Sequence, residues 1–178
     1  MNHFEIFGLS PSVDLDLGAL EAKYRALAME AHPDRAAGAD AATRRKMAEQ
    51  TASLNEAVKV LKDPVRRALY VLKLRGVDLE NETAAAKQKM PPEFLEEVME
   101  RREALDAARA SKDVAKAQAM GDEVGALLDA AMGKAKLALS KPASDLAAIT
   151  EATEALARVR YFTRYLEEVS AIEEEAMQ

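Results

Sequence analysis

The chain has no cysteine, no tryptophan and only two histidines among its 178 residues. Without cysteine it cannot form a disulfide, use a cysteine nucleophile or hold a metal or an iron–sulfur cluster through thiolates. Two histidines are too few for a histidine-rich metal site, and they disfavour acid–base catalysis. The composition therefore directs the search toward binding rather than toward catalysis.

Glycine, proline and aromatic residues are also scarce, with seven glycines, six prolines and 4% aromatics. No apolar run approaches the roughly 18 residues that a membrane-spanning helix needs. The amino-terminal residues lack a basic region followed by an apolar stretch, so we expect no secretory signal. The chain is instead rich in Ala, Glu, Leu, Lys and Arg, and 49% of it is hydrophobic. This composition predicts an all-α protein with a true core.

The net charge of −6 is divided unevenly along the chain. Residues 1–76 carry 12 Lys and Arg against 10 Asp and Glu, whereas residues 77–178 carry 13 against 21. A weakly basic first part joined to an acidic second part predicts two modules with different partners. Neither part has the basic excess that neutralises phosphates, so we expect no nucleic-acid partner.

Apolar spacing and capping residues predict the helices of the first module, residues 1–76. A short turn at 4–9 precedes a helix that Asp16 caps and that ends near Ala31, before the constrained residue His32. Asp40 caps a second long helix. Pro64 opens a shorter helix, since proline suits the first helical position, and Gly76 ends it.

Residues 77–91 are predicted to be a linker, because they are polar and their apolar residues show no sustained helical period. Residues 92–178 are predicted to form a three-helix bundle. The three helices are expected at about 92–109, 112–139 and 144–174, with Ser111 and Ser144 as N-caps. The middle helix contains Gly121, Gly125 and Gly133, which we attribute to close contact with a neighbouring helix.

The tripeptide His32-Pro33-Asp34 lies between two amphipathic helices and is the most informative motif. Pro33 fixes its own φ and restricts His32, and His32 lies at a helix carboxyl end that favours a donor or cation. Asp34 can offer a carboxylate to an arginine of another protein. Two other interpretations stay open: an incidental helix-stopping proline, and a catalytic His–Asp pair, which lacks a recognisable nucleophile.

With its flanks, this module resembles a J-domain, and the resemblance covers nearly all of residues 1–76. It implies that His32, Pro33, Asp34 and Arg35 engage a DnaK-type chaperone and stimulate its ATPase, with Lys23 and Arg25 on the preceding helix adding a basic face. Arg35 stands where lysine is common in the family. The J-domain itself performs no enzymatic chemistry. The residues that carry the resemblance are Phe4-Glu5-Ile6-Phe7-Gly8-Leu9, Leu20, Tyr24, His32-Pro33-Asp34-Arg35, Asn55-Glu56-Ala57, Leu61, Asp63-Pro64, Arg67-Ala68 and Tyr70.

Helix 92–109 shows two apolar stripes, although a bundle needs one. Leu95 and Met99 lie apart from the core-like stripe and among carboxylates, which predicts a docking surface for a partner with apolar and basic groups. On the last helix, counting 100° per residue places Tyr161 and Tyr165 away from the Leu156 seam, as exposed interface anchors. The alternative for Tyr161 is packing against the first module or over the bundle ends.

The order of the modules and four segments resemble the HscB family of iron–sulfur co-chaperones. The resemblance implies an all-α protein without a cofactor or a metal, not an enzyme, that binds an IscU-like cluster scaffold and brings it to an HscA-like chaperone. Carried over by position, the scaffold-binding residues are Leu95, Met99, Glu100, Glu103 and Tyr161. The segments are Phe94-Leu95, Met99-Glu100, Arg102-Glu103-Ala104-Leu105 and Val159-Arg160-Tyr161-Phe162.

Two positions depart from this family pattern: Glu96 replaces an apolar residue, and Ala107 stands where a glutamate can occur. We expect a cytoplasmic, bacterial-type protein with no membrane association that is a monomer or a weak dimer. Two alternatives remain from the residues alone. One is a J-domain co-chaperone for a different client, and the other is a structural helical adaptor without a chaperone.

Overall fold

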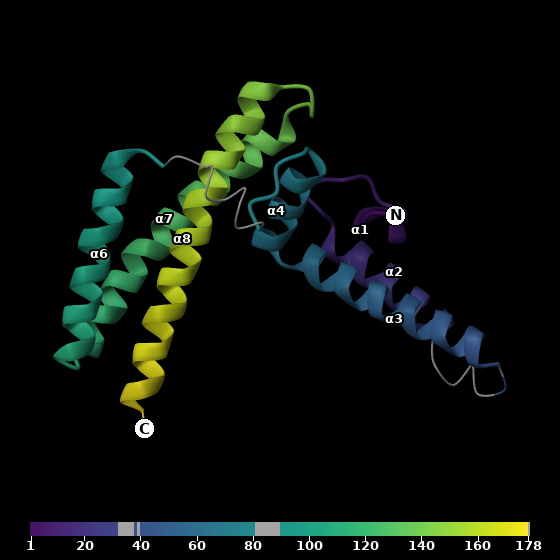
Figure 1. Cartoon of the computed structure of the whole chain (residues 1–178), viewed down its shortest axis with the longest axis horizontal. Coiled ribbons are helices and arrows are strands. Elements are labelled where there is room, and N and C mark those ends of the chain that lie inside the picture. Colours follow the sequence, from purple (N-terminus) through teal and green to yellow (C-terminus); the bar gives the residue numbers. More distant parts are fainter. Residues whose placement is uncertain (32–37, 39, 81–89, 178) are drawn as a thin grey trace. The chain divides into compact units, whose positions relative to one another are not determined.

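The computed structural model describes residues 1–31, 38, 40–80 and 90–177, and every regular element in these ranges is a helix (Figure 1). The all-α prediction is thereby confirmed. The chain divides into two compact units, Met1–Val71 and Leu72–Gln178. The division falls within helix α4 (Pro64–Leu74). The two units are described separately.

The first unit is built on an antiparallel hairpin of α2 (Leu17–Glu30) and α3 (Ala41–Lys62), with α1 (His3–Ile6) against it (Figure 1). The predicted caps are confirmed: the Asp16 carboxylate accepts from the backbone N–H of Ala19, and that of Asp40 accepts from Thr43. These bonds satisfy helix-end donors that have no partner within the helix. The core includes Phe4, Phe7, Val13, Leu20, Leu54, Ala57, Leu61, Ala68 and Val71, all buried.

A buried arginine joins three segments of this unit. Arg67 is 6% exposed; its Nε donates to the carbonyl oxygen of Val13 at 2.9 Å and its NH1 to that of Leu61 at 2.6 Å. Burial lowers the pKa of this guanidinium, partly offset by the negative charges of Asp14 and Asp63. Arg67 therefore fixes the loop before α2 against the end of α3 and the start of α4.

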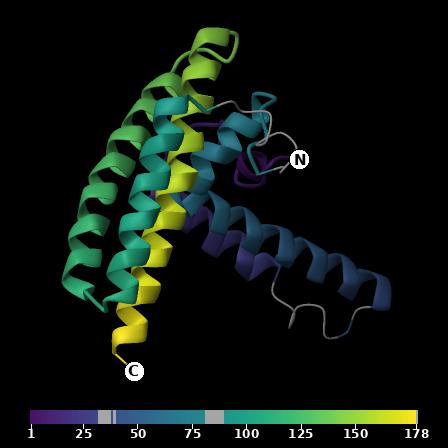
Figure 2. The ribbon, with the colours of Figure 1, turned by 60° about the vertical axis from the view of Figure 1, so that its left-hand side comes forward.

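The second unit contains α6 (Pro92–Ala110), α7 (Val114–Ser140) and α8 (Leu146–Ala176), the three-helix bundle expected from the sequence. Figure 2 shows α7 and α8 as a long antiparallel pair, with α6 lying along both. Leu105, Val124, Leu156 and Val159 are at most 2% exposed and form the centre of the bundle core.

The predicted N-caps of α7 and α8 are wrong by one or two residues. Asp113 caps α7 and Asp145 caps α8, each through a carboxylate that accepts a backbone N–H. Ser111 is instead the C-cap of α6, and its hydroxyl donates to the carbonyl of Ala107. Serine and aspartate cap equally well, but the carboxylate also interacts favourably with the positive end of the helix dipole.

Only one of the three glycines of α7 is in close contact with another helix. A Cβ at Gly121 would lie 3.1 Å from Cγ1 of Val169 on α8, so the predicted close approach holds there. Around Gly125 and Gly133, nothing in the described structure lies within 4 Å of the position a Cβ would take. The explanation from helix contact is wrong for these two positions.

Candidate functional site

The tripeptide motif and Arg35 lie outside the described residues, so His32, Pro33, Asp34 and Arg35 are known only from the sequence. The helices that flank them are described. Helix α2 ends with Ala31 as its C-cap, and α3 begins after Asp40. The motif therefore belongs to the segment that joins the two helices of the hairpin.

Two hydrogen bonds join α2 and α3 in the half of the hairpin nearest the segment that contains the motif. The Thr51 hydroxyl donates to the carbonyl of Ala31 at 3.0 Å, and the Tyr24 hydroxyl lies 2.9 Å from the Asn55 side-chain oxygen. Between Leu20 and Leu54, no described residue of α2 or α3 is buried. In this part of the hairpin the two hydrogen bonds join helices whose apolar side chains are at most half-buried.

The two basic residues predicted on α2 have different environments. Nζ of Lys23 donates to the carbonyl of Phe7 at 2.8 Å and lies 3.4 Å from that of Gly8. The Arg25 side chain is 74% exposed, 3.5 Å from Glu21. Glu21 lies 2.7 Å from Lys62, and the hydrogen bond from Lys62 is the main reason that its pKa is lowered. Arg25 is thus the more accessible cation on this face.

Helix α6 presents the two stripes that the sequence predicts. Phe94, Leu105 and Ala108 are buried, whereas Leu95 is 49% exposed and Met99 is 63% exposed. Around the exposed pair, the carboxylates of Glu96, Glu100 and Glu103 are exposed, and none of the three makes an ion pair with another described residue. We call Leu95, Met99 and these three glutamates the α6 patch.

Tyr161 borders the α6 patch, but Tyr165 does not. Tyr161 is half-buried rather than exposed as predicted, and its hydroxyl donates to the carbonyl of Val98 at 3.2 Å. Tyr165 is only 3% exposed and its hydroxyl donates to the carbonyl of Arg101 at 3.3 Å, so its predicted exposure is wrong. Burial raises the pKa of both phenols. Counting residues along α8 did not account for α6, whose backbone carbonyls at Val98 and Arg101 accept hydrogen bonds from both tyrosines.

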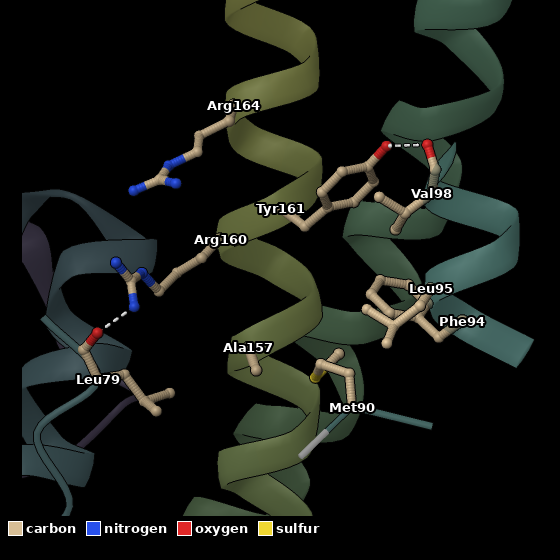
Figure 3. Close-up of a pocket in the computed structure, with 9 residues that line it drawn as sticks. All are labelled: Leu79, Met90, Phe94, Leu95, Val98, Ala157, Arg160, Tyr161 and Arg164. Atoms are coloured by element: carbon tan, nitrogen blue, oxygen red, sulfur yellow. Dashed lines mark hydrogen bonds between the residues drawn. The ribbon is translucent and has the colours of Figure 1, made fainter. Parts of the chain in front are cut away.

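A small pocket of about 240 Å³ lies beside the α6 patch (Figure 3). Four of its lining residues belong to one face of α8: Ala157, Arg160, Tyr161 and Arg164. Its other lining residues are Leu79, Met90, Phe94, Leu95 and Val98. The pocket was not predicted from the sequence, although the spacing 157, 160, 161 and 164 places these side chains on one face of a helix.

One wall of the pocket comes from the segment that was predicted to be a linker. Leu79 is 3% exposed, and a guanidinium N–H of Arg160 donates to its carbonyl oxygen. Figure 3 shows the Arg164 side chain extending from α8 toward the same side as Arg160 and away from Tyr161. Arg164 is exposed and forms no hydrogen bond or ion pair with any other described residue.

Among the described residues, no group of three or more Asp, Glu or His is placed to hold a metal ion. None of the described helices is long and apolar enough to cross a membrane. The arrangement offers exposed apolar side chains, carboxylates and arginines on a three-helix bundle. These are groups that bind a protein surface.

Comparison with known proteins identifies both units. A family model for the DnaJ domain matches residues 2–70, and one for the HSCB C-terminal oligomerisation domain matches residues 90–170. The co-chaperone protein HscB homologue of Burkholderia thailandensis is 38% identical over 174 residues, or 96% of this chain and 93% of that protein. That of Ralstonia nicotianae is 46% identical over 112 residues, which span 63% of this chain and 62% of that protein.

Solved structures agree with the sequence comparison. The chaperone HscB from Vibrio cholerae matches with a TM-score of 0.79 and 30% identity, covering 98% of this chain and 99% of that one. Human co-chaperone protein HscB matches with a TM-score of 0.81 and 25% identity, covering 96% of this chain and 81% of that one. The two-unit helical architecture is thus shared over nearly the whole chain.

Proposed function

Because the chain belongs to the HscB family of co-chaperones, we propose that it binds an iron–sulfur cluster scaffold resembling IscU and delivers it to a DnaK-type chaperone resembling HscA. The three-helix unit holds the scaffold and the J-domain stimulates the chaperone's ATPase. The chain performs no covalent chemistry itself. It acts in the cytoplasm as a monomer or a weak dimer, in the maturation of iron–sulfur proteins.

The observation that carries the proposal is the α6 patch. Leu95 and Met99 expose about half or more of their surface, although the same helix already buries a complete apolar stripe. Exposed apolar side chains surrounded by polar groups are typical of a protein-binding surface. Tyr161 extends this surface from α8, since it lines the same pocket as Leu95. We therefore assign Leu95, Met99, Glu100, Glu103 and Tyr161 to scaffold binding.

For the J-domain, we propose that Asp34 accepts a charge-assisted hydrogen bond from an arginine of the chaperone. His32, Pro33 and Arg35 shape and flank this acceptor. Arg25 adds an accessible positive charge on α2, supported by its exposed side chain. Lys23 remains a predicted contact whose ammonium already donates to the carbonyl of Phe7.

Steady-state ATPase of the chaperone from the same organism tests the J-domain proposal. The wild-type chain should stimulate hydrolysis, and the purified scaffold should increase this stimulation further. Asp34→Asn removes the negative charge but keeps the shape, so it should abolish stimulation while leaving scaffold binding unchanged. Equal stimulation by wild type and Asp34→Asn would show that the tripeptide is incidental.

A nuclear magnetic resonance titration with the scaffold tests the α6 patch. Leu95→Ala and Met99→Ala should each weaken binding by about tenfold, since one well-placed interface side chain contributes on the order of 1–2 kcal/mol. Leu137→Ala is the matched control, because Leu137 is 65% exposed on α7 and lies outside the patch. If the scaffold perturbs no patch residue, the client of this co-chaperone is a different protein.

A further inference from the structure

The pocket between Leu79, Ala157 and Leu95 is a recess that a side chain of a partner could enter. Its volume of about 240 Å³ is below the roughly 300–1,000 Å³ of typical small-molecule sites, so its size suits a side chain better than a cofactor. Ala157 of α8 lines the pocket with a short side chain, and a larger residue at this position would reduce its volume (Figure 3). Leu95 belongs both to this pocket and to the α6 patch.

The pocket also differs in charge from the α6 patch. Glu96, Glu100 and Glu103 lie on α6, while Arg160 and Arg164 line the pocket from α8. Arg160 donates a hydrogen bond to the carbonyl oxygen of Leu79, so its main role is to hold this lining residue in place. Arg164 is exposed and lacks an ion-pair partner among the described residues, including Glu167 and Glu168 that follow it on α8.

We propose that this pocket receives an aliphatic side chain of the scaffold and that Arg164 pairs with a carboxylate next to that side chain. This inference rests on the proposed function and specifies the chemistry of the partner surface. That surface would present an apolar residue beside an acid to the pocket, and basic groups to the glutamates of the α6 patch. Opposite charges on the two sides of one apolar contact favour a single orientation of the partner, because the reversed orientation brings like charges together.

Two substitutions test the pocket and the charge separately. Ala157→Leu fills the pocket without changing charge, and leucine is nearly as good a helix former as alanine. Arg164→Glu reverses the charge at the rim. Ala119→Leu and Lys116→Glu are the controls, because both residues are exposed on α7 and line no part of the pocket. Circular dichroism and the thermal midpoint establish that each variant is folded.

Affinity for the purified scaffold is measured by calorimetry at low and at high salt. Ala157→Leu and Arg164→Glu should each raise Kd by about tenfold at low salt, and both controls should bind like wild type. Arg164→Glu should also reduce the loss of affinity with salt, since an attractive pair has been removed. Replacing the matching scaffold carboxylate by lysine should restore binding to Arg164→Glu.

The possible failures are distinguishable. If Leu95→Ala weakens scaffold binding but Ala157→Leu and Arg164→Glu do not, the pocket inference is wrong and the proposed function stands. If wild type does not bind the scaffold, both are wrong. If sedimentation shows that the wild-type chain self-associates and that Ala157→Leu abolishes this without affecting scaffold binding, the pocket is occupied by a second copy and the inference is wrong.

Discussion

The ammonium of Lys23 on α2 donates a hydrogen bond to the carbonyl oxygen of Phe7, 2.8 Å away. Phe7 is the C-cap of α1, where backbone carbonyls lack helical partners. A cation at this position satisfies one of them and interacts favourably with the negative end of the helix. Lys23 therefore attaches the short α1 to the hairpin, whatever it contributes to chaperone binding.

Lys23→Met should destabilise the first unit by about 1 kcal/mol, because it removes a charge-assisted hydrogen bond at a half-buried position. Arg25→Met is the control and should have little effect on stability, since Arg25 makes only an exposed contact with Glu21. Urea unfolding followed by nuclear magnetic resonance signals of residues 1–71 measures both variants. Equal stability of Lys23→Met and wild type would show that this bond contributes nothing.

Arg67→Met should destabilise the same unit by about 2–3 kcal/mol, since the substitution leaves buried carbonyl groups unpaired. Arg67→Lys should restore little of the loss. Lysine has a single ammonium and lacks the fork that reaches both Val13 and Leu61. The same residue-resolved urea experiment measures the two variants. If Arg67→Lys were as stable as wild type, the role assigned to the two-pronged guanidinium group would be contradicted.

Gly125→Ala should stabilise the bundle by about 0.5–1 kcal/mol, because alanine is the better helix former and nothing described lies within 4 Å of the new Cβ. Gly121→Ala should gain less or lose stability, since its Cβ would lie 3.1 Å from Cγ1 of Val169. Thermal unfolding of the two single variants gives the comparison. The prediction fails if Gly121→Ala is the more stabilising of the two.

The bundle should lose stability as the pH rises above about 10, the ordinary pKa of a tyrosine phenol. Burial raises the pKa of Tyr161 and Tyr165 in the folded chain, so the unfolded chain releases these protons at lower pH than the folded one. The contribution of the two protonated phenols to the free energy of unfolding is therefore fully present below the pKa of tyrosine in the unfolded chain and decreases above it. In denaturant titrations over this pH range, Tyr165→Phe should make the decrease shallower, and an unchanged slope would contradict the assignment.

Much of the helical framework follows from local chemistry, which a sequence displays directly. Asp16 and Asp40 cap the hairpin helices and Pro64 opens α4 because each satisfies a requirement of its own helix end. The separation of Leu95 and Met99 from the buried stripe of α6 follows from the helical period alone. These features need no knowledge of a neighbouring helix.

Only the tertiary structure determines which segment packs against each face of a helix. The period of α8 places Tyr165 at a definite angle but does not say that α6 covers it. It likewise does not show that Val169 approaches Gly121 and leaves Gly125 free, or that Leu79 closes a pocket over Ala157. A single helix specifies angles about its own axis, whereas contacts depend on distances between segments far apart in the chain. Only the packed structure contains those distances.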